Sequence, residues 1–195
     1  MTHKKFNVKN IVIFASGSGT NAQAILDYFK DSENTCVSLI LSNKKKAPVL
    51  DRAQKAGIPA MSFNRHAFAK AGPVHSLLKS IQPDLIVLAG FLWKIPEFLI
   101  TDFPNQIINL HPSLLPKYGG KGMYGIAVHE AVLANKESKS GITIHFVNEE
   151  YDKGAYIAQF ECDVMEGDTP STLAGRIHQL EHQHLPATIE KLLHG

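Results

Sequence analysis

An asparagine and a histidine, Asn109 and His111, stand two residues apart at the end of an apolar run. Residues i and i+2 of a strand project to the same side, so the amide and the imidazole are expected to face one space. An amide N–H can stabilise a developing oxyanion, and an imidazole can do the same or transfer a proton. Pro112 and Pro116 stiffen the backbone that follows. This pattern favours a positioned catalytic site over a histidine that is only part of the core.

A carboxylate that could complete such a site is Asp152, which follows Glu149 and Glu150 in a segment that ends at Gly154. Most acidic residues in loops are simply solvated. If Asp152 contacts His111, its charge would orient the imidazole and favour the protonated form. The sequence by itself leaves both interpretations open.

A second polar segment follows the first apolar run: Gly17, Ser18, Gly19, Thr20 and Asn21. Glycines let the backbone approach a ligand, and the start of a following helix offers free amides and the positive end of its dipole. The spacing is neither GxGxxG nor a triphosphate loop, so a single phosphate is the favoured ligand. A tight turn capped by Ser or Thr explains the same residues about equally well.

Near the C-terminus, His178, Glu181 and His182 match the HxxEH pattern of one zinc peptidase group, and His184 follows. The two outer histidines would share one helix face, which is plausible for a metal. Five-residue patterns also arise by chance, and no third ligand follows at a recognisable spacing. A zinc hydrolase is therefore a disfavoured alternative, and we expect no metal.

Composition narrows the class of protein. The chain has 195 residues, 44% hydrophobic and 19% charged, which predicts one globular domain with its own core. The formal net charge of +2 argues against a nucleic-acid partner, which would need a basic stripe. Cys36 and Cys162 fall in apolar runs and are interpreted as small buried hydrophobes in a reducing compartment.

No stretch approaches the roughly 18 apolar residues of a membrane span. The N-terminal segment 1–9 is polar and basic, and resembles neither a signal peptide nor a transit sequence. We therefore expect a cytoplasmic protein without a membrane partner.

The elements that would position these residues alternate between two patterns. A continuous apolar run predicts a strand buried on both faces over 10–15, and further strands are predicted over 37–41, 58–63, 85–89 and 106–110. Amphipathic segments predict helices over 20–30, 47–56, 65–80 and 172–193, with a break near Gly72-Pro73 and a kink or end at Pro186. Residues 142–146 and 156–162 alternate apolar with polar, which predicts an antiparallel pair with one buried face.

This order predicts an α/β fold, doubly wound, with a mostly parallel sheet, an antiparallel edge pair and a C-terminal helix. In such sheets ligands bind beyond the carboxyl ends of the strands. The polar segments described above fall at those ends.

Taken together, the segments resemble the folate-dependent formyltransferase family. The matching residues are 15–21, 88–91, 109–116, 141–147 and Asp152, in the family's order through nearly the whole chain. The Asn-x-His-Pro-Ser-x-Leu-Pro run is specific to the family. The glycine loop followed by Asn21 resembles the branch that formylates 5'-phosphoribosylglycinamide in de novo purine biosynthesis. The resemblance implies a single formyltransferase domain over 1–195, with 10-formyltetrahydrofolate as the co-substrate.

The resemblance also implies roles for residues. The amine would attack the formyl carbon directly, with Asn109 and protonated His111 stabilising the oxyanion and Asp152 helping to remove the amine proton through water. Gly17, Ser18, Gly19, Thr20 and Asn21 would hold the substrate phosphate, and Glu181 would contact the substrate. The implied folate-binding residues are Arg65, Phe91, Leu92, Trp93, Lys94, Ile95 and Val147. The implied supporting residues are Ser113, Thr143 and His145.

Three places depart from the family pattern. Trp93 stands where the family commonly has arginine, so Lys94 or Lys121 would have to meet the folate carboxylates. Asp-Gly-Gly is replaced by Asp152-Lys153-Gly154. The loop 117–125 is longer and rich in glycine, and we expect it to be mobile and to order on binding.

Other functions stay open. A methionyl-tRNA formyltransferase would add a C-terminal tRNA domain and a formyltetrahydrofolate hydrolase an N-terminal regulatory domain, and the length of the chain favours neither. A non-catalytic nucleotide-binding module would have no need of Asn109, His111 and Asp152. We expect small-molecule substrates and a monomer or homodimer.

Overall fold

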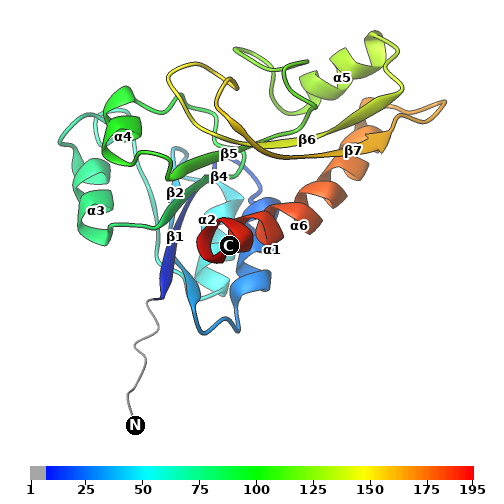
Figure 1. Ribbon diagram of the computed structural model, residues 1–195. Coiled ribbons are helices and arrows are strands. Elements are labelled where there is room, and N and C mark those ends of the chain that lie inside the picture. The colour runs from blue at the N-terminus through cyan, green and yellow to red at the C-terminus, as the bar shows by residue number, and fades with distance from the viewer. Residues whose placement is uncertain (1–7) are drawn as a thin grey trace. The chain divides into compact units, whose positions relative to one another are not determined.

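The computed structural model describes residues 8–195 and divides into two compact units (Figure 1). The first unit runs up to Phe91 and includes Leu193–Gly195, and the second is Leu92–Leu192. The interpretation of segment 1–9 falls almost wholly outside the described residues. Over residues 8–195, no helix combines the length and the apolar character that crossing a membrane requires.

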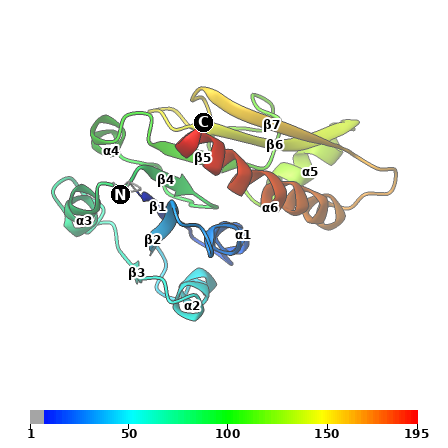
Figure 2. The same ribbon diagram turned by 60° about the horizontal axis from the view of Figure 1, so that its bottom comes forward.

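The first unit is a parallel sheet with helices on both sides. Its strands are β1 (Lys9–Phe14), β2 (Thr35–Ser42), β3 (Ala60–Ser62) and β4 (Leu85–Leu88), in the order β3-β2-β1-β4. Its helices are α1 (Thr20–Phe29), α2 (Pro48–Lys55) and α3 (Pro73–Ile81). Figure 2 shows α1 and α2 on one side of these strands and α3 on the other. The run Ile11–Phe14 is fully buried because helices cover both faces, which confirms the doubly wound prediction here.

The predicted helix over 65–80 was too long. Only Pro73–Ile81 is helical, and residues 65–72 form turns. Pro73 suits a first helical position, where its missing N–H costs nothing. A side chain at Gly72 would collide with the carbonyl oxygens of Ala67 and Ala69, so the turn that precedes the helix requires glycine.

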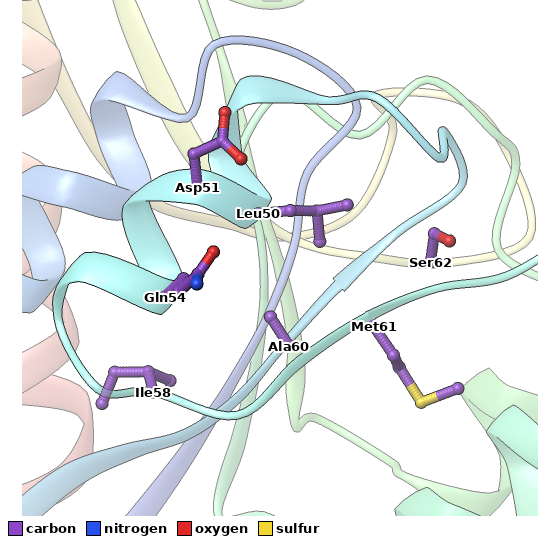
Figure 3. Close-up of a pocket in the computed structure, with 7 residues that line it drawn as sticks. All are labelled: Leu50, Asp51, Gln54, Ile58, Ala60, Met61 and Ser62. Atoms are coloured by element: carbon purple, nitrogen blue, oxygen red, sulfur yellow. The ribbon is translucent and has the colours of Figure 1, made fainter.

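A pocket opens beside α2 and the edge strand β3 of the first unit (Figure 3). Its lining residues are Leu50, Asp51, Gln54, Ile58, Ala60, Met61 and Ser62. They include none of the residues predicted to bind a ligand or to take part in catalysis.

The second unit is antiparallel. Its strands are β5 (Ile107–His111), β6 (Lys139–Phe146) and β7 (Tyr156–Asp163), in the order β5-β6-β7. The β6–β7 pairing confirms the predicted antiparallel edge pair. Its helices are α4 (Glu97–Asp102), α5 (Ile126–Ala134) and most of α6 (Pro170–His194). The sequence pattern predicts neither α4 nor α5, because α4 is short and α5 is apolar on nearly all sides and lacks a helical period.

Three further expectations were wrong. The alternating residues of β6 do not leave one face in solvent, since Thr143 and His145 are 0% and 2% exposed. They are covered by the 113–115 segment and by the loop that carries Asp152. Of the kink or end predicted at Pro186, the end is wrong, because the last helix continues through the buried Pro186 to His194. Cys36 and Cys162 are free thiols that are half-buried, not fully buried.

Candidate active site

The second unit brings Asn109, His111 and Asp152 into contact. Asn109 and His111 come from the end of β5, and Asp152 comes from the loop between β6 and β7. The Asn109 Nδ2 atom lies 3.4 Å from Asp152 Oδ1, and the His111 Nδ1 atom lies 3.5 Å from Asp152 Oδ2. Asp152 has a left-handed backbone with φ of 56°, which turns its carboxylate toward the strand ends. The open question about Asp152 is thus answered: it meets both partners.

His145 completes this polar centre, which we define as Asn109, His111, His145 and Asp152. His145 pairs directly across the sheet with Asn109. Its Nδ1 lies 2.8 Å from the Phe146 carbonyl, which can only accept, so the proton belongs on Nδ1. In the neutral ring Nε2 therefore accepts a hydrogen bond from Asn109 Nδ2 at 3.2 Å, whereas in the protonated ring it is a donor that faces Asp152 Oδ1 at 3.6 Å. These contacts orient the Asn109 amide and leave its longer bond to Asp152 available for exchange.

Burial and charge oppose each other in the polar centre. Burial lowers the pKa of His111 below its ordinary value, although the Asp152 charge and the Tyr118 carbonyl pull it upward. Burial raises the pKa of Asp152, but His145, the charge of His111 and the Gly120 N–H together bring it below its ordinary value. Asp152 is therefore an ionised acceptor, and the free protein favours neutral His111. The protonated His111 implied by the resemblance would have to form as charge develops.

The segment 118–120 covers His111 and Asp152. The Tyr118 carbonyl oxygen lies 2.8 Å from His111 Nε2, and the Gly120 N–H donates to Asp152 Oδ2 at 2.8 Å. A side chain at Gly119 would meet the end of the Leu115 side chain and the Asp152 Cβ, so a larger residue here would require these neighbours to shift. The sequence predicted only a mobile loop here. These contacts could not be predicted from residue types, because backbone groups make them.

A buried hydrogen-bond network supports the segment that follows β5. Thr143 Oγ1 donates to the Ser113 carbonyl at 2.7 Å and accepts from the Leu115 N–H at 3.0 Å. Ser113 Oγ donates to the Lys117 carbonyl at 2.7 Å. Gln159 Nε2 adds bonds to Thr143 Oγ1 and to the Leu115 carbonyl, both at 2.9 Å. Gln159 was not predicted as a site residue. Its place opposite Thr143 on the paired strand is the feature that could have identified it.

The glycine loop belongs to the first unit and precedes α1. Gly17 and Ser18 are exposed, and Gly19 has a left-handed φ of 72° at the start of the helix. No side chain caps α1, so the alternative of a Ser or Thr cap is wrong. The Val49 N–H donates to the Gly17 carbonyl at 3.2 Å, and Arg52 Nε donates to the Ser18 carbonyl at 2.8 Å. Exposed backbone at a helix N-terminus suits an anion.

The residues that the resemblance assigns to folate divide between the units. In the first unit, Arg65 is exposed and Phe91 packs against Phe14, Phe63 and Phe68. In the second unit, Leu92 and Lys94 are exposed, Trp93 and Val147 are half-buried, and Ile95 is buried. The Lys94 ammonium lies 5.8 Å from the ring centre of Tyr151.

The HxxEH residues of α6 do not form a metal site. Glu181 is buried at 5% exposure, whereas His178 and His182 are exposed. Their rings lie parallel with centres 6.3 Å apart, and the His184 ring stacks on Phe160. Among residues 8–195, no group of three or more His, Cys, Asp or Glu side chains is placed to hold a metal ion.

Comparison with known proteins identifies the family. The sequence profile of the formyl transferase family matches residues 9–189. The chain is 36% identical to phosphoribosylglycinamide formyltransferase of Bacillus subtilis over 95% of both chains. It is 42% identical to the chloroplastic enzyme of that name from Arabidopsis thaliana over 90% of this chain, and spans 62% of that relative's length. It superposes on glycinamide ribonucleotide transformylase 1 from Symbiobacterium toebii with a TM-score of 0.87, at 32% identity over 97% of this chain and 89% of the other.

This chain therefore belongs to the formyl transferase family. The names of these relatives specify one particular acceptor, which is called phosphoribosylglycinamide in two of them and glycinamide ribonucleotide in the third. The superposition also agrees with the predicted fold class over nearly the whole chain.

Proposed function

We propose that this protein transfers the formyl group of 10-formyltetrahydrofolate to the amine of 5'-phosphoribosylglycinamide. The observation that carries the proposal is the contact of Asp152 with both Asn109 and His111 in a chain of this family. The implied substrates are small molecules, and the whole chain would act as one cytoplasmic formyltransferase domain, as a monomer or homodimer.

In this proposal the amine attacks the formyl carbon and the carbonyl oxygen becomes an oxyanion. The Asn109 amide, oriented by His145, would donate to that oxygen in place of its 3.4 Å bond to Asp152. Neutral His111 would accept the proton that the attacking amine loses, either directly or through water. The Asp152 carboxylate would stabilise the resulting imidazolium. The oxyanion would then re-form the carbonyl as the bond between the formyl carbon and the folate nitrogen breaks, and the proton held by His111 would pass to that nitrogen, which leaves tetrahydrofolate and the formylated amine.

The glycine loop would hold the substrate phosphate. Gly17 and Ser18 are exposed just before a ten-residue helix, and Arg52 adds positive charge beside the loop. The remaining site residues keep the roles that the resemblance implies. Glu181 would contact the substrate. The residues that would bind the folate are Arg65, Phe91, Leu92, Trp93, Lys94, Ile95 and Val147.

The test is an assay with both substrates that follows formyl loss spectroscopically, with and without the amine acceptor. Loss that depends on the acceptor supports the transferase. Loss at the same rate without acceptor would make the protein a hydrolase, and no loss in either tube would overturn both activities.

A further inference from the structure

Tyr118 has a backbone conformation that needs contacts to hold it. Its φ of 56° lies in the left-handed region, which costs a non-glycine residue free energy unless its surroundings impose it. Two contacts fix it: its carbonyl oxygen lies 2.8 Å from His111 Nε2, and its hydroxyl donates to Glu137 Oε1 at 2.8 Å. Tyr118 thus joins the polar centre to a residue in the connection between α5 and β6.

One carboxylate oxygen of Glu137 accepts hydrogen bonds from two consecutive loop residues. Its Oε1 atom accepts from the Tyr118 hydroxyl and from the Lys117 ammonium, each at 2.8 Å. The bond from Lys117, followed by that from Tyr118, lowers the pKa of Glu137, which is therefore a charged acceptor at neutral pH. The Lys117 side chain is 64% exposed, so this ion pair adds little stability by itself. Its significance lies in the position it gives Tyr118.

The Tyr118 carbonyl determines which nitrogen of His111 is chemically available. A carbonyl oxygen only accepts, so the proton of neutral His111 lies on Nε2. Nδ1 then carries the lone pair and faces Asp152 Oδ2 at 3.5 Å. A proton taken up by the ring arrives on Nδ1, beside the carboxylate that stabilises it. The other ionisable group acting on His111 is His145, which lowers its pKa.

We propose that Glu137 and Tyr118 are positioning residues for His111: Glu137 holds the Tyr118 hydroxyl so that the Tyr118 carbonyl stays on Nε2. The effect on turnover rests on the proposed function, whereas the effect on His111 itself does not. Neither residue needs to touch a substrate for this role.

The direct test is an NMR titration of the His111 imidazole, which needs no substrate. Tyr118→Phe removes only the hydroxyl, and Glu137→Ala removes its acceptor. Both variants should lower the pKa of His111 by about 0.5 unit, because a contact that raises it is loosened. Glu137→Gln keeps an acceptor and should restore most of the wild-type titration. Glu161→Ala is the control, because Glu161 is an exposed residue of β7 that pairs with Lys139 at 2.6 Å.

The kinetic test separates positioning from binding. Tyr118→Phe and Glu137→Ala should each lower kcat about 3- to 10-fold, as expected for one neutral hydrogen bond, with both KM values within about 2-fold of wild type. The double variant should be no worse than either single one, because both changes remove the same contact. Unchanged His111 titration in Tyr118→Phe and Glu137→Ala would overturn the positioning role. If the titration shifts while even the wild type transfers no formyl group, the positioning role stands and the proposed function fails.

Discussion

The glycine loop of the first unit and the polar centre of the second are built in different ways. The loop is shaped by backbone and steric contacts: Gly19 packs against Val49, and the Gly17 and Ser18 carbonyls are held by Val49 and Arg52. The polar centre consists of four side chains whose hydrogen bonds depend on charge and tautomer. Hydrogen bonds made by backbone groups do not change with pH, whereas those made by titratable side chains do.

Burial follows the same division. Among residues 8–195, the buried polar side chains of the first unit are the hydroxyls of Ser16, Thr35 and Ser42. The buried ionisable side chains all lie in the second unit: His111, His129, His145 and Glu181. Among residues 8–195, the fully buried groups that can titrate are therefore those of the second unit.

The largest expected effect is on the side-chain site. Asp152→Asn keeps the shape of the side chain but removes the charge that stabilises an imidazolium at His111. We expect kcat for formyl transfer to fall about 10³-fold, within the range for losing acid–base assistance. Circular dichroism should show an unchanged fold. Asp163→Asn, at an exposed aspartate on β7, is the matched control. A fully active Asp152→Asn variant would refute the role of this carboxylate.

Acid should destabilise the protein through His129. Burial, then the nearby charge of His178, lowers its pKa from 6.5 to about 4, and its buried Nδ1 has no hydrogen-bond partner. The unfolded chain binds this proton more tightly, so the stabilisation is complete above pH 6.5 and is lost as pH falls toward 4. The loss is at most about 3 kcal/mol. Urea unfolding across this pH range should show a flatter profile for His129→Leu.

The control for that profile is His66→Leu, because His66 is an exposed histidine of the first unit. It should keep the wild-type pH dependence. If both variants flatten the profile equally, acid sensitivity is not a property of the second unit's buried histidines.

The stability of the glycine loop should depend on the steric fit of its glycines. A side chain at Gly19 would collide with Val49 in a left-handed conformation, whereas Gly17 has open space around it. Gly19→Ala should lower the free energy of unfolding by about 2 kcal/mol and raise KM for the phosphorylated substrate. Gly17→Ala should change stability by less than about 0.5 kcal/mol. Equal effects in urea unfolding would contradict the steric account of this loop.

The smallest expected effect is at Arg52. Arg52→Gln removes the bond from Nε to the Ser18 carbonyl and a positive charge beside the loop. We expect KM for the phosphorylated substrate to rise about 5-fold with little change in kcat, as for one lost hydrogen bond. Lys55→Gln removes an exposed charge from the same helix and serves as the control. A larger effect on kcat than on KM would mean that Arg52 acts beyond the loop.

Local pattern determined a large part of this protein. The continuous apolar run over 10–15 predicted the buried strand β1, the amphipathic segment 47–56 predicted α2, and the spacing of Asn109 and His111 placed both on one side of β5. These features depend on neighbours in the chain, so they can be recognised without a structure. The prediction that β6 leaves one face exposed was wrong, because nothing in the local sequence shows that the chain returns to cover Thr143 and His145.

Only the tertiary structure decided what the polar residues touch. Asp152 is 41 residues after His111 in the chain, and no local pattern says whether they meet. The same holds for Gln159 on Thr143, and for the Tyr118 carbonyl on His111, which is a backbone contact that any residue type could make. Side-chain pattern specifies which groups are available, whereas burial and long-range packing determine their partners, their pKa values and the nitrogen of His111 that carries the proton.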